Sequence, residues 1–298
     1  MPLNSFYPNS PDIIITENQP LKQFSTLGTG GTAEFFAQPE TIPQLQELII
    51  SAKNMPVYVI GGGSNIIIPD GLIHGLAIST RRLDAVSWQN DSSAEIESGH
   101  NLSHLVKILR EKNIGGLEFS AGIPGTTGGA VSGNAGAGGR GICEFIECVK
   151  AVDISGGLVT FRRGEFDYGY RMCSISGVII ASATMSFSDC PAWNESLYSD
   201  FMSRRKSQPL RFRSAGCTFK NPPGNSAGKL LDECGCKGLK FGGASVSDMH
   251  ANFIINSGHA TSSDVLGLAE KCAQRVYECT GIKLELEIKT LSPCFSVQ

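Results

Sequence analysis

The sequence predicts an α+β fold, because segments with helical and strand-like patterns are mixed along it without strict β–α–β alternation. The chain has 298 residues, 41% of them apolar and 18% charged, which suits about two globular domains. A polar, charged stretch at 194–207 precedes Pro209 and indicates a helix followed by a domain junction. We therefore expect an N-terminal α/β part at 1–70, a central domain at 71–207, and a C-terminal domain at 208–298 that ends in a strand.

Each expected element rests on a local pattern. Residues 41–53 predict a helix, since Thr41 can cap its N-terminus, Pro43 fits its first turn, and apolar residues recur along one face. The apolar run at 56–60 predicts a buried strand that leads into a glycine cluster. Similar patterns predict further strands at 76–80, 94–98, 148–154, 158–161, 178–187, 218–221, 252–256 and 282–291, and further helices near 101–112, 194–207, 226–234 and 263–279.

Charge, hydropathy and cysteine content argue against several classes of protein. The net charge is 25 − 28 = −3, so no basic field predicts nucleic-acid binding, and no apolar run approaches the ~18 residues of a membrane span. The N-terminal residues lack the charged and apolar regions of a signal peptide. The ten cysteines include no pair of C-x-x-C units. We therefore expect a cytoplasmic protein with reduced thiols and without a metal site.

The chain has 35 glycines, and they cluster in two segments, "IGGGSNII" at 60–67 and a longer one at 115–141. Glycine allows positive φ and close backbone approach, so consecutive N–H groups can converge on a diphosphate. The alternative is a long flexible loop, but the apolar residues, proline and asparagine along 115–141 indicate an ordered turn and helix. We expect a valine at Gly62 to exclude the diphosphate while leaving the chain folded.

Six motifs carry a resemblance to a known family. In chain order they are "GGGSN", "AGIPGTTGGAVSGNAGAGG", "YGYR", "SAGCTFKNP", "SAGKLLDECGCKGLKFGGASVSDMHANFIIN" and "LELEIK". With them, the sequence from about residue 22 to 291 resembles the UDP-N-acetylenolpyruvoylglucosamine reductase family. The short link between "YGYR" and "SAGC" is similar to the family's shorter subtype, which lacks an extra substrate-covering loop.

The resemblance implies a fold, an activity and two redox partners. The fold would be an FAD-binding domain of the vanillyl-alcohol-oxidase/PCMH type, followed by a C-terminal α+β substrate-binding domain. The activity would be reduction of UDP-N-acetylglucosamine enolpyruvate to UDP-N-acetylmuramate in peptidoglycan precursor synthesis. FAD would be bound non-covalently, NADPH would be the co-substrate, and the protein would act as a monomer.

The resemblance also implies binding residues, position by position. FAD would be held by Ile60, Gly61, Gly62, Gly63, Ser64, Asn65, Ala121, Gly122, Ile123, Pro124, Thr126, Thr127, Gly129, Ala130, Asn134 and Ile179. The UDP-sugar would contact Tyr170, Lys220, Asn221 and Asn252. A residue of "RRKSQP" would hold the diphosphate, and the register there leaves Arg204, Arg205, Lys206 and Ser207 open.

Three residues are implied to be catalytic. Hydride from flavin N5 to an enolpyruvyl double bond moves negative charge onto the carboxylate, and one proton must follow, so the site requires a cation, an anchor and an acid. By motif these are Arg171, Glu287 and Cys217, the last at a position where most members carry serine. Strand alternation alone does not separate Glu287 from Glu285, because it places both on one solvated face. We expect Arg171 to lower the pKa of the Cys217 thiol.

Two other functions are compatible with the glycine segments. One is a flavin oxidase of the same cofactor-binding architecture that acts on a small alcohol or sugar acid. The other is a non-catalytic protein that binds nucleotide sugars through a nest of backbone N–H groups. The colour of the purified protein and its bleaching by NADPH distinguish the binding protein from the enzymes.

Overall fold

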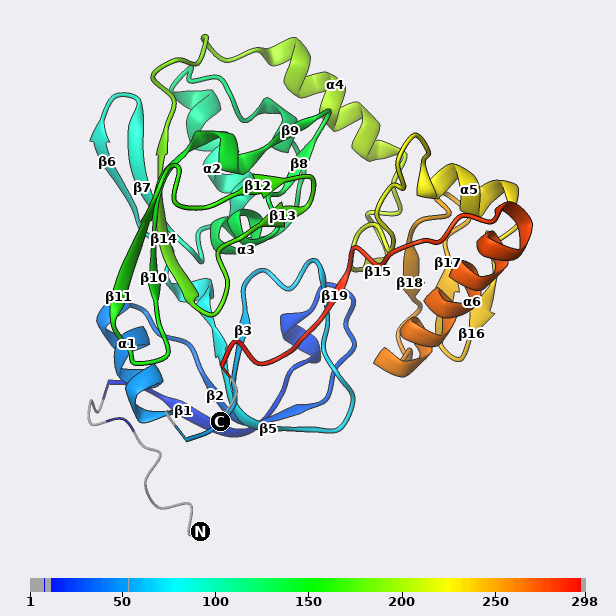
Figure 1. The fold of residues 1–298 in the computed structure, drawn as a ribbon, viewed down its shortest axis with the longest axis horizontal. Helices are drawn as coiled ribbons and strands as arrows, with labels where there is room; N and C mark the ends of the chain where they lie inside the picture. Colours follow the sequence, from blue (N-terminus) through cyan, green and yellow to red (C-terminus); the bar gives the residue numbers. More distant parts are fainter. Residues whose placement is uncertain (1–7, 9–11, 53, 296–298) are drawn as a thin grey trace.

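The computed structural model describes residues 8, 12–52 and 54–295 (Figure 1). The first residues, on which the signal-peptide expectation partly rests, and the last three lie outside this description. In the described ranges no helix has the length and apolarity needed to cross a bilayer. The helices are α1 (Ile42–Ser51), α2 (Leu102–Glu111), α3 (Thr127–Ser132), α4 (Glu195–Lys206), α5 (Ala227–Glu233) and α6 (Ser262–Thr280).

The N-terminal sheet has the strand order β1-β2-β5-β3, with β1 antiparallel to β2 and the other pairs parallel. Helix α1 packs against it through Leu45, Leu48 and Ile49 and begins at Thr41, whose hydroxyl accepts the predicted capping hydrogen bond. Because the sheet includes β5, its pairing continues past residue 70, so a boundary near Ser79 fits the strands better. The four strands are β1 (Ile15–Pro20), β2 (Thr32–Ala37), β3 (Val57–Ile60) and β5 (Leu72–Ser79).

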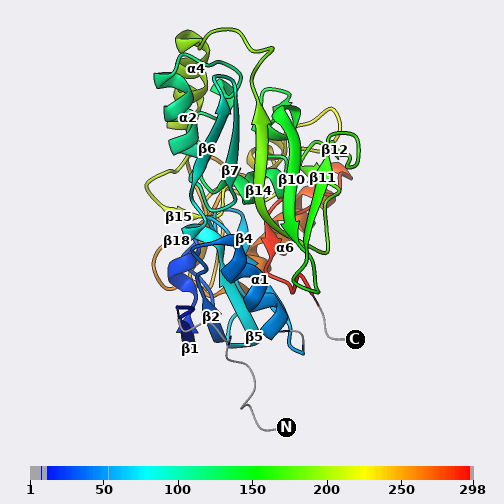
Figure 2. The same ribbon diagram turned by 90° about the vertical axis from the view of Figure 1, so that its left-hand side faces the viewer.

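The central sheet is antiparallel throughout, and its five strands stand side by side in Figure 2. The expected hairpin is present, since β10 pairs with β11 across a turn that Asp153 closes by accepting the N–H groups of Ser155 and Gly157. In sheet order the strands are β11 (Leu158–Arg162), β10 (Ile146–Val152), β14 (Ile179–Ser186), β7 (Ser93–Glu97) and β6 (Val86–Asn90).

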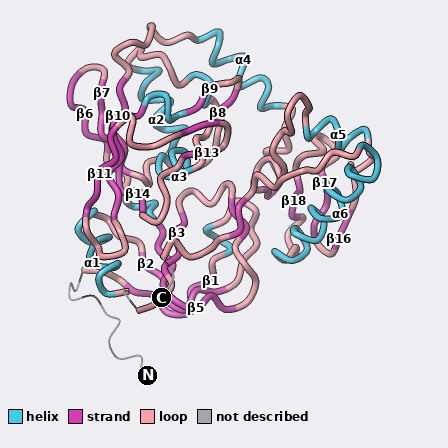
Figure 3. The backbone as a smooth tube through the Cα atoms, viewed as in Figure 1, coloured by secondary structure: helices cyan, strands magenta, loops and turns pink. Residues whose placement is uncertain are grey.

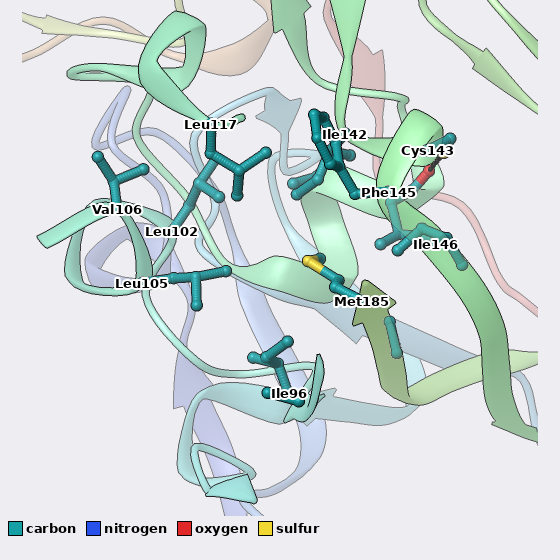
Figure 4. Packing of buried hydrophobic residues seen from close by; sticks show 14 of the residues in the cluster. Ile96, Leu102, Leu105, Val106, Leu117, Ile142, Cys143, Phe145, Ile146 and Met185 are labelled. Carbon is teal, nitrogen blue, oxygen red and sulfur yellow. Dashed lines mark hydrogen bonds between the residues drawn. The ribbon is translucent and has the colours of Figure 1, made fainter. Parts of the chain in front are cut away.

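One apolar cluster joins this sheet to the helices that cover it (Figure 4). Helix α2 contributes Leu102, Leu105 and Leu109, which are fully buried, as its helical spacing requires. Ile96 and Met185 meet them from β7 and β14 (Figure 4). The second glycine segment crosses this cluster and contains α3, so it is an ordered part of the core rather than a flexible loop.

The C-terminal group is a separate small sheet with α5 and α6 beside it (Figure 1). Helix α6 is capped by Thr261, whose hydroxyl accepts the Asp264 N–H, and ends at Gly281 with φ 73°. The strands in sheet order are β15 (Arg213–Ser214), β18 (Ile254–Asn256), β17 (Ala244–Val246) and β16 (Lys240–Phe241).

Three short strand pairs connect segments outside the main sheets. The pair β19–β4 brings the end of the chain back to the N-terminal group, and an isolated bridge between Val57 and Phe295 continues that return. The pairs are β12 (Tyr168–Gly169) with β13 (Met172–Cys173), β8 (Gly136–Ala137) with β9 (Arg140–Gly141), and β4 (Ile66–Ile67) with β19 (Lys289–Thr290).

The strands expected at 218–221 and 282–291 do not form as regular elements, apart from the two residues of β19. Both segments are mostly loop in Figure 3, joined by one bridge between Phe219 and Leu286. The expected alternation also fails, since Leu286 is 41% exposed whereas Ile288 is buried. The segment passes over several neighbours in turn, so no single sheet imposes a period of two on it.

We expect Leu105→Ala to lower the free energy of unfolding by about 2–5 kcal/mol, because it removes a fully buried side chain from the central cluster. Chemical denaturation followed by circular dichroism measures the change. Lys107→Ala on the exposed face of α2 is the matched control and should change stability by less than about 0.5 kcal/mol. Equal losses in both variants would show that α2 does not pack as described.

Candidate functional site

The first glycine segment follows β3 and lies directly against the second. A Cβ added to Gly62 would lie 2.5 Å from Gly125 Cα, a distance at which something must move. The Ser64 hydroxyl also joins the loops, by donating to the Pro124 carbonyl at 3.1 Å. A valine at Gly62 would therefore force the two backbones apart, so it would disturb the fold itself, contrary to the expectation from sequence.

Backbone donors gather where these loops meet. The N–H groups of Gly62, Gly63 and Ser64 donate to no other residue in the described part of the chain. The loop carbonyls are engaged instead: the Arg81 guanidinium donates to Gly61 and Gly62 carbonyls at 3.1 and 2.9 Å. Free N–H groups at the junction of two glycine loops suit an anion such as a diphosphate. Nothing in the sequence around Arg81 marked it for this part.

Two further observations fit a ligand at this junction. Thr126 Oγ1 is buried without a hydrogen-bond partner among the described residues, and a Cβ on Gly61 would lie 2.7 Å from it. Gly129 is exposed, and a Cβ added there would meet only this same hydroxyl, at 3.6 Å. Buried polar groups are normally paired. The residues present therefore fit the diphosphate of a dinucleotide cofactor.

Other residues expected at the cofactor support the loops from behind. Their side chains are buried, and Ile179 packs with α1 in the N-terminal cluster; the set comprises Ile60, Ala121, Ile123, Thr127, Ala130, Asn134 and Ile179. The Asn134 amide donates to the Gly169 carbonyl at 2.8 Å and accepts the Cys143 N–H at 3.0 Å. Asn134 thus braces the β12–β13 hairpin, and its side chain is committed to that contact.

Arg171 and Glu287 form an ion pair between distant parts of the chain. Arg171 Nε lies 2.6 Å from Glu287 Oε1, and the side chains are only 27% and 12% exposed. The Nε–H is not aligned for a hydrogen bond, whereas Nη1 donates to the Gly136 carbonyl at 2.9 Å. Arg171 has φ 56°, which is uncommon for a residue other than glycine and is found where the surroundings enforce it.

Strand alternation predicts equal exposure for Glu287 and Glu285, but the two residues differ in burial and in their charged partner. Burial raises the pKa of Glu287, although the Arg171 guanidinium opposes the shift. Glu285 is 77% exposed and lies 3.3 Å from Lys220 Nζ. The Glu287 backbone is also tied to the first glycine loop, because Asn65 Nδ2 donates to its carbonyl at 3.3 Å. The structure therefore selects Glu287 for the interior of the site.

Cys217 lies in the same interior, and its acidity is opposite to what was expected. Burial, followed by the Glu287 carboxylate, raises the pKa of the thiol to about 11, although the charges of Arg171 and Arg205 act against this. Arg171 does act to lower this pKa, as expected, but burial and the carboxylate outweigh the two guanidinium groups, so the net shift is upward. The thiol thus remains protonated well above neutral pH.

Differences in burial narrow the choice of the residue of "RRKSQP" that could hold the diphosphate. Arg205 is half-buried near Cys217 and Arg171, whereas Arg204, Lys206 and Ser207 are exposed. Its guanidinium donates to Gln208 Oε1 at 3.0 Å and has no carboxylate partner within the described ranges. Burial lowers its pKa. A Cβ on Gly122 would lie 3.3 Å from Arg205 Cγ, so this cation lies beside the second glycine loop.

The expected substrate contacts are placed unequally. Tyr170 is 60% exposed, and its hydroxyl accepts the Asn221 N–H at 3.4 Å. Asn221 Oδ1 accepts the Ala227 N–H at the start of α5. Lys220 Nζ lies 3.3 Å from the exposed carboxylate of Glu285. Asn252 is different, because it is 3% exposed and both ends of its amide bind the backbone of Phe219.

We expect alkylation of Cys217 to have a pH midpoint near 11 rather than near 9, because the thiolate is the nucleophile and burial with Glu287 disfavours it. Peptide-resolved mass spectrometry after timed iodoacetamide treatment measures the midpoint for each cysteine separately. In Glu287→Gln the midpoint should move down, since a raising charge is removed. A wild-type midpoint below about 8.5 would restore the expectation that the guanidinium groups prevail.

Comparisons with known proteins point to one family over nearly the whole chain. Residues 33–162 match the FAD binding domain, and residues 208–291 match the C-terminal domain of UDP-N-acetylenolpyruvoylglucosamine reductase. The chain is 36% identical over 283 residues to that reductase from Syntrophus aciditrophicus, covering 91% of this chain and 90% of the relative. It is 38% identical over 274 residues to the one from Protochlamydia amoebophila, covering 90% and 91%.

A solved structure agrees with the sequence relatives. The crystal structure of UDP-N-acetylenolpyruvylglucosamine reductase from Thermus caldophilus is 33% identical, with a TM-score of 0.77 over 93% of this chain and 98% of that one. The predicted class, an FAD-binding domain followed by a C-terminal α+β domain, is confirmed. The chain belongs to the UDP-N-acetylenolpyruvoylglucosamine reductase family.

Proposed function

We propose that this protein reduces the enolpyruvyl group of UDP-N-acetylglucosamine enolpyruvate to give UDP-N-acetylmuramate, with NADPH as reductant. The observation that carries the proposal is the half-buried Arg171–Glu287 ion pair, whose charges act on the nearby, half-buried Cys217 thiol. The reductase relatives and the two domain matches support the same reaction. We place the reaction in the cytoplasm, in peptidoglycan precursor synthesis, and expect the enzyme to act as a monomer.

The cofactor in this proposal is non-covalent FAD, which supplies hydride to the substrate when bound. Its diphosphate would be held by the N–H groups of Gly62, Gly63 and Ser64 and by the Thr126 hydroxyl, none of which has a hydrogen-bond partner among the described residues. Arg81 keeps the first loop in shape from the opposite side. The matched FAD binding domain, residues 33–162, contains all of these groups.

The chain's own task is to stabilise charge on the substrate carboxylate and to supply one proton. A fixed guanidinium such as that of Arg171 suits this charge, since it needs no reorganisation when the charge appears. Glu287 holds the guanidinium in place at 2.6 Å. The Cys217 thiol, with a pKa of about 11, keeps its proton at neutral pH and is still a far stronger acid than a serine hydroxyl. The thiol therefore still carries its proton at neutral pH and is acidic enough to donate it.

In the proposal the substrate is recognised by two groups of residues, one inside the site and one at its exposed edge, which we call the rim. Arg205 is the member of "RRKSQP" suited to the diphosphate, because it is a half-buried cation without a carboxylate partner in the described chain. Tyr170, Lys220 and Asn221 form the rim, from which they can reach the sugar nucleotide. Asn252 does not belong to this group, because its amide is already engaged.

We expect Gly129→Val to weaken FAD binding about tenfold or more, because a Cβ at this exposed position lies 3.6 Å from Thr126 Oγ1 and the side chain it carries would occupy space proposed for the diphosphate. A tenfold loss is ~1.4 kcal/mol. Flavin absorbance of the purified protein measures occupancy, and circular dichroism checks the fold. Ser132→Val, exposed on the same helix α3, is the matched control and should stay yellow. Stoichiometric flavin in Gly129→Val would place the cradle elsewhere.

The reaction itself is tested by separating its halves in stopped flow. We expect NADPH to bleach the yellow protein and the enolpyruvyl substrate to restore its colour. Arg171→Ala, Glu287→Gln and Cys217→Ala should each slow the second half about 10²–10³-fold and the first far less, because each loses a group that acts on substrate charge or supplies the proton. Cys217→Ser, which keeps a donor, should retain measurable turnover.

Three outcomes would contradict this account. Equal slowing of both halves would give the three residues a role in binding or folding. A colourless protein that binds the UDP-sugar would be a binding module. Reduction of the flavin by an alcohol followed by its re-oxidation by oxygen, with no re-oxidation by the enolpyruvyl compound, would indicate a flavin oxidase.

A further inference from the structure

Asn252 holds the segment that carries Cys217. Its Oδ1 accepts the Phe219 N–H at 2.9 Å, and its Nδ2 donates to the Phe219 carbonyl at 2.8 Å. Its own carbonyl accepts the Thr218 N–H at 2.7 Å. One buried residue therefore satisfies three backbone groups of the two residues that follow Cys217.

The other side of the segment is held by the chain that contains Glu287. The Glu287 N–H donates to the Thr218 carbonyl at 2.8 Å, and the Lys220 N–H donates to the Glu285 carbonyl at 2.9 Å. Thr218 thus bonds to Asn252 through its N–H and to Glu287 through its carbonyl. Thr218 and the two residues beside it therefore fix the register in which the Cys217 segment lies against the Glu287 segment.

An asparagine side chain suits this position because its amide reproduces a strand partner where regular pairing is missing. Strand β18 begins only at Ile254, two residues further on. A side-chain carbonyl and NH2 offer the same acceptor and donor as a peptide unit. The turn that presents them is closed locally, since the Asn252 N–H donates to His250 Nδ1 at 3.2 Å.

We propose that Asn252 is a positioning residue for the proton donor: it fixes the Cys217 segment in register with Glu287 and keeps the thiol enclosed. This role replaces the direct substrate contact implied by the family motif. The inference rests on the proposed function for its kinetic consequence, but the enclosure of the thiol is a property of the protein alone. Placing a reacting group incorrectly by about 1 Å can cost about 10²-fold in rate.

The test uses Asn252→Asp, because protonation of the introduced carboxyl switches its hydrogen bonding. The neutral carboxyl can accept the Phe219 N–H and donate to the Phe219 carbonyl, whereas the ionised form can only accept. Burial raises a carboxyl pKa, so the neutral form persists to higher pH than usual. We expect the substrate half-reaction to approach the wild-type rate at low pH and to fall about 10²-fold as pH rises through that pKa. Flavin reduction by NADPH should remain within about threefold of wild type.

The second readout is alkylation of Cys217, which needs no substrate. In Asn252→Asp at neutral pH the loosened segment should expose the thiol, so alkylation should speed up and its midpoint should fall from about 11 toward the ordinary value. Asn256→Asp is the matched control: its amide also binds buried backbone, but at Leu27, Gly258 and Ala260. It should leave the Cys217 midpoint and the ratio of the two half-reactions unchanged.

If Asn252→Asp does not fold, Asn252→Gln gives the same comparison with both hydrogen-bonding groups displaced by one methylene. Parallel slowing of both half-reactions at every pH, or wild-type alkylation of Cys217 in the variants, would overturn the proposal. If the wild type itself does not reduce the enolpyruvyl substrate, the proposed function fails, while the alkylation comparison still decides the role of Asn252.

Discussion

The ion pair between Arg171 and Glu287 is the contact on which the rest of the site depends. It joins the hairpin of the central group to the segment that leaves the C-terminal group, and it partly shields both charges from solvent. Asn134 and the Gly136 carbonyl hold the arginine side, and Asn65 holds the glutamate side. Removing one charge would leave the other buried and unpaired, which costs more than the pair contributes.

The glycine loops impose the second constraint, because two backbones approach each other too closely for side chains. Gly62 faces Gly125 there, and the carbonyls of the first loop accept hydrogen bonds from Arg81, while the N–H groups of Gly62, Gly63 and Ser64 have no acceptor in the part of the chain that the structure describes. Such a junction is specific in shape and nearly free of side-chain chemistry. A diphosphate can therefore be bound here without a local excess of lysine or arginine, which agrees with the small net charge of the chain.

Sequence reasoning succeeded where structure is decided locally. Helices α1 and α6 were predicted within two residues, because caps and helical spacing fix them. It failed at 282–291, where the conformation depends on Thr218 and Asn65, residues far away in the chain. Glu287 and Glu285 share a sequence pattern but differ in burial and in charged partner, Arg171 for the first and Lys220 for the second. The expected direction of the Cys217 pKa shift was wrong for the same reason. The shift depends on burial and on charges from distant segments, which carry Glu287, Arg171 and Arg205, and the sequence next to Cys217 does not reveal them.

The chain enters the C-terminal group between α4 and β15 and leaves it just before β19 (Figure 1). The lobe is also held between these crossings, because the Asn256 amide donates to the Leu27 carbonyl at 2.9 Å and Asp70 accepts the Ser262 and Ser263 N–H groups, both at 3.0 Å. Cys217 lies a few residues after the first crossing, and Glu287 lies within the second. Both residues therefore lie beside the covalent connections of the C-terminal group, and the Glu287 N–H donates to the Thr218 carbonyl at 2.8 Å, so the two crossings are also tied to each other.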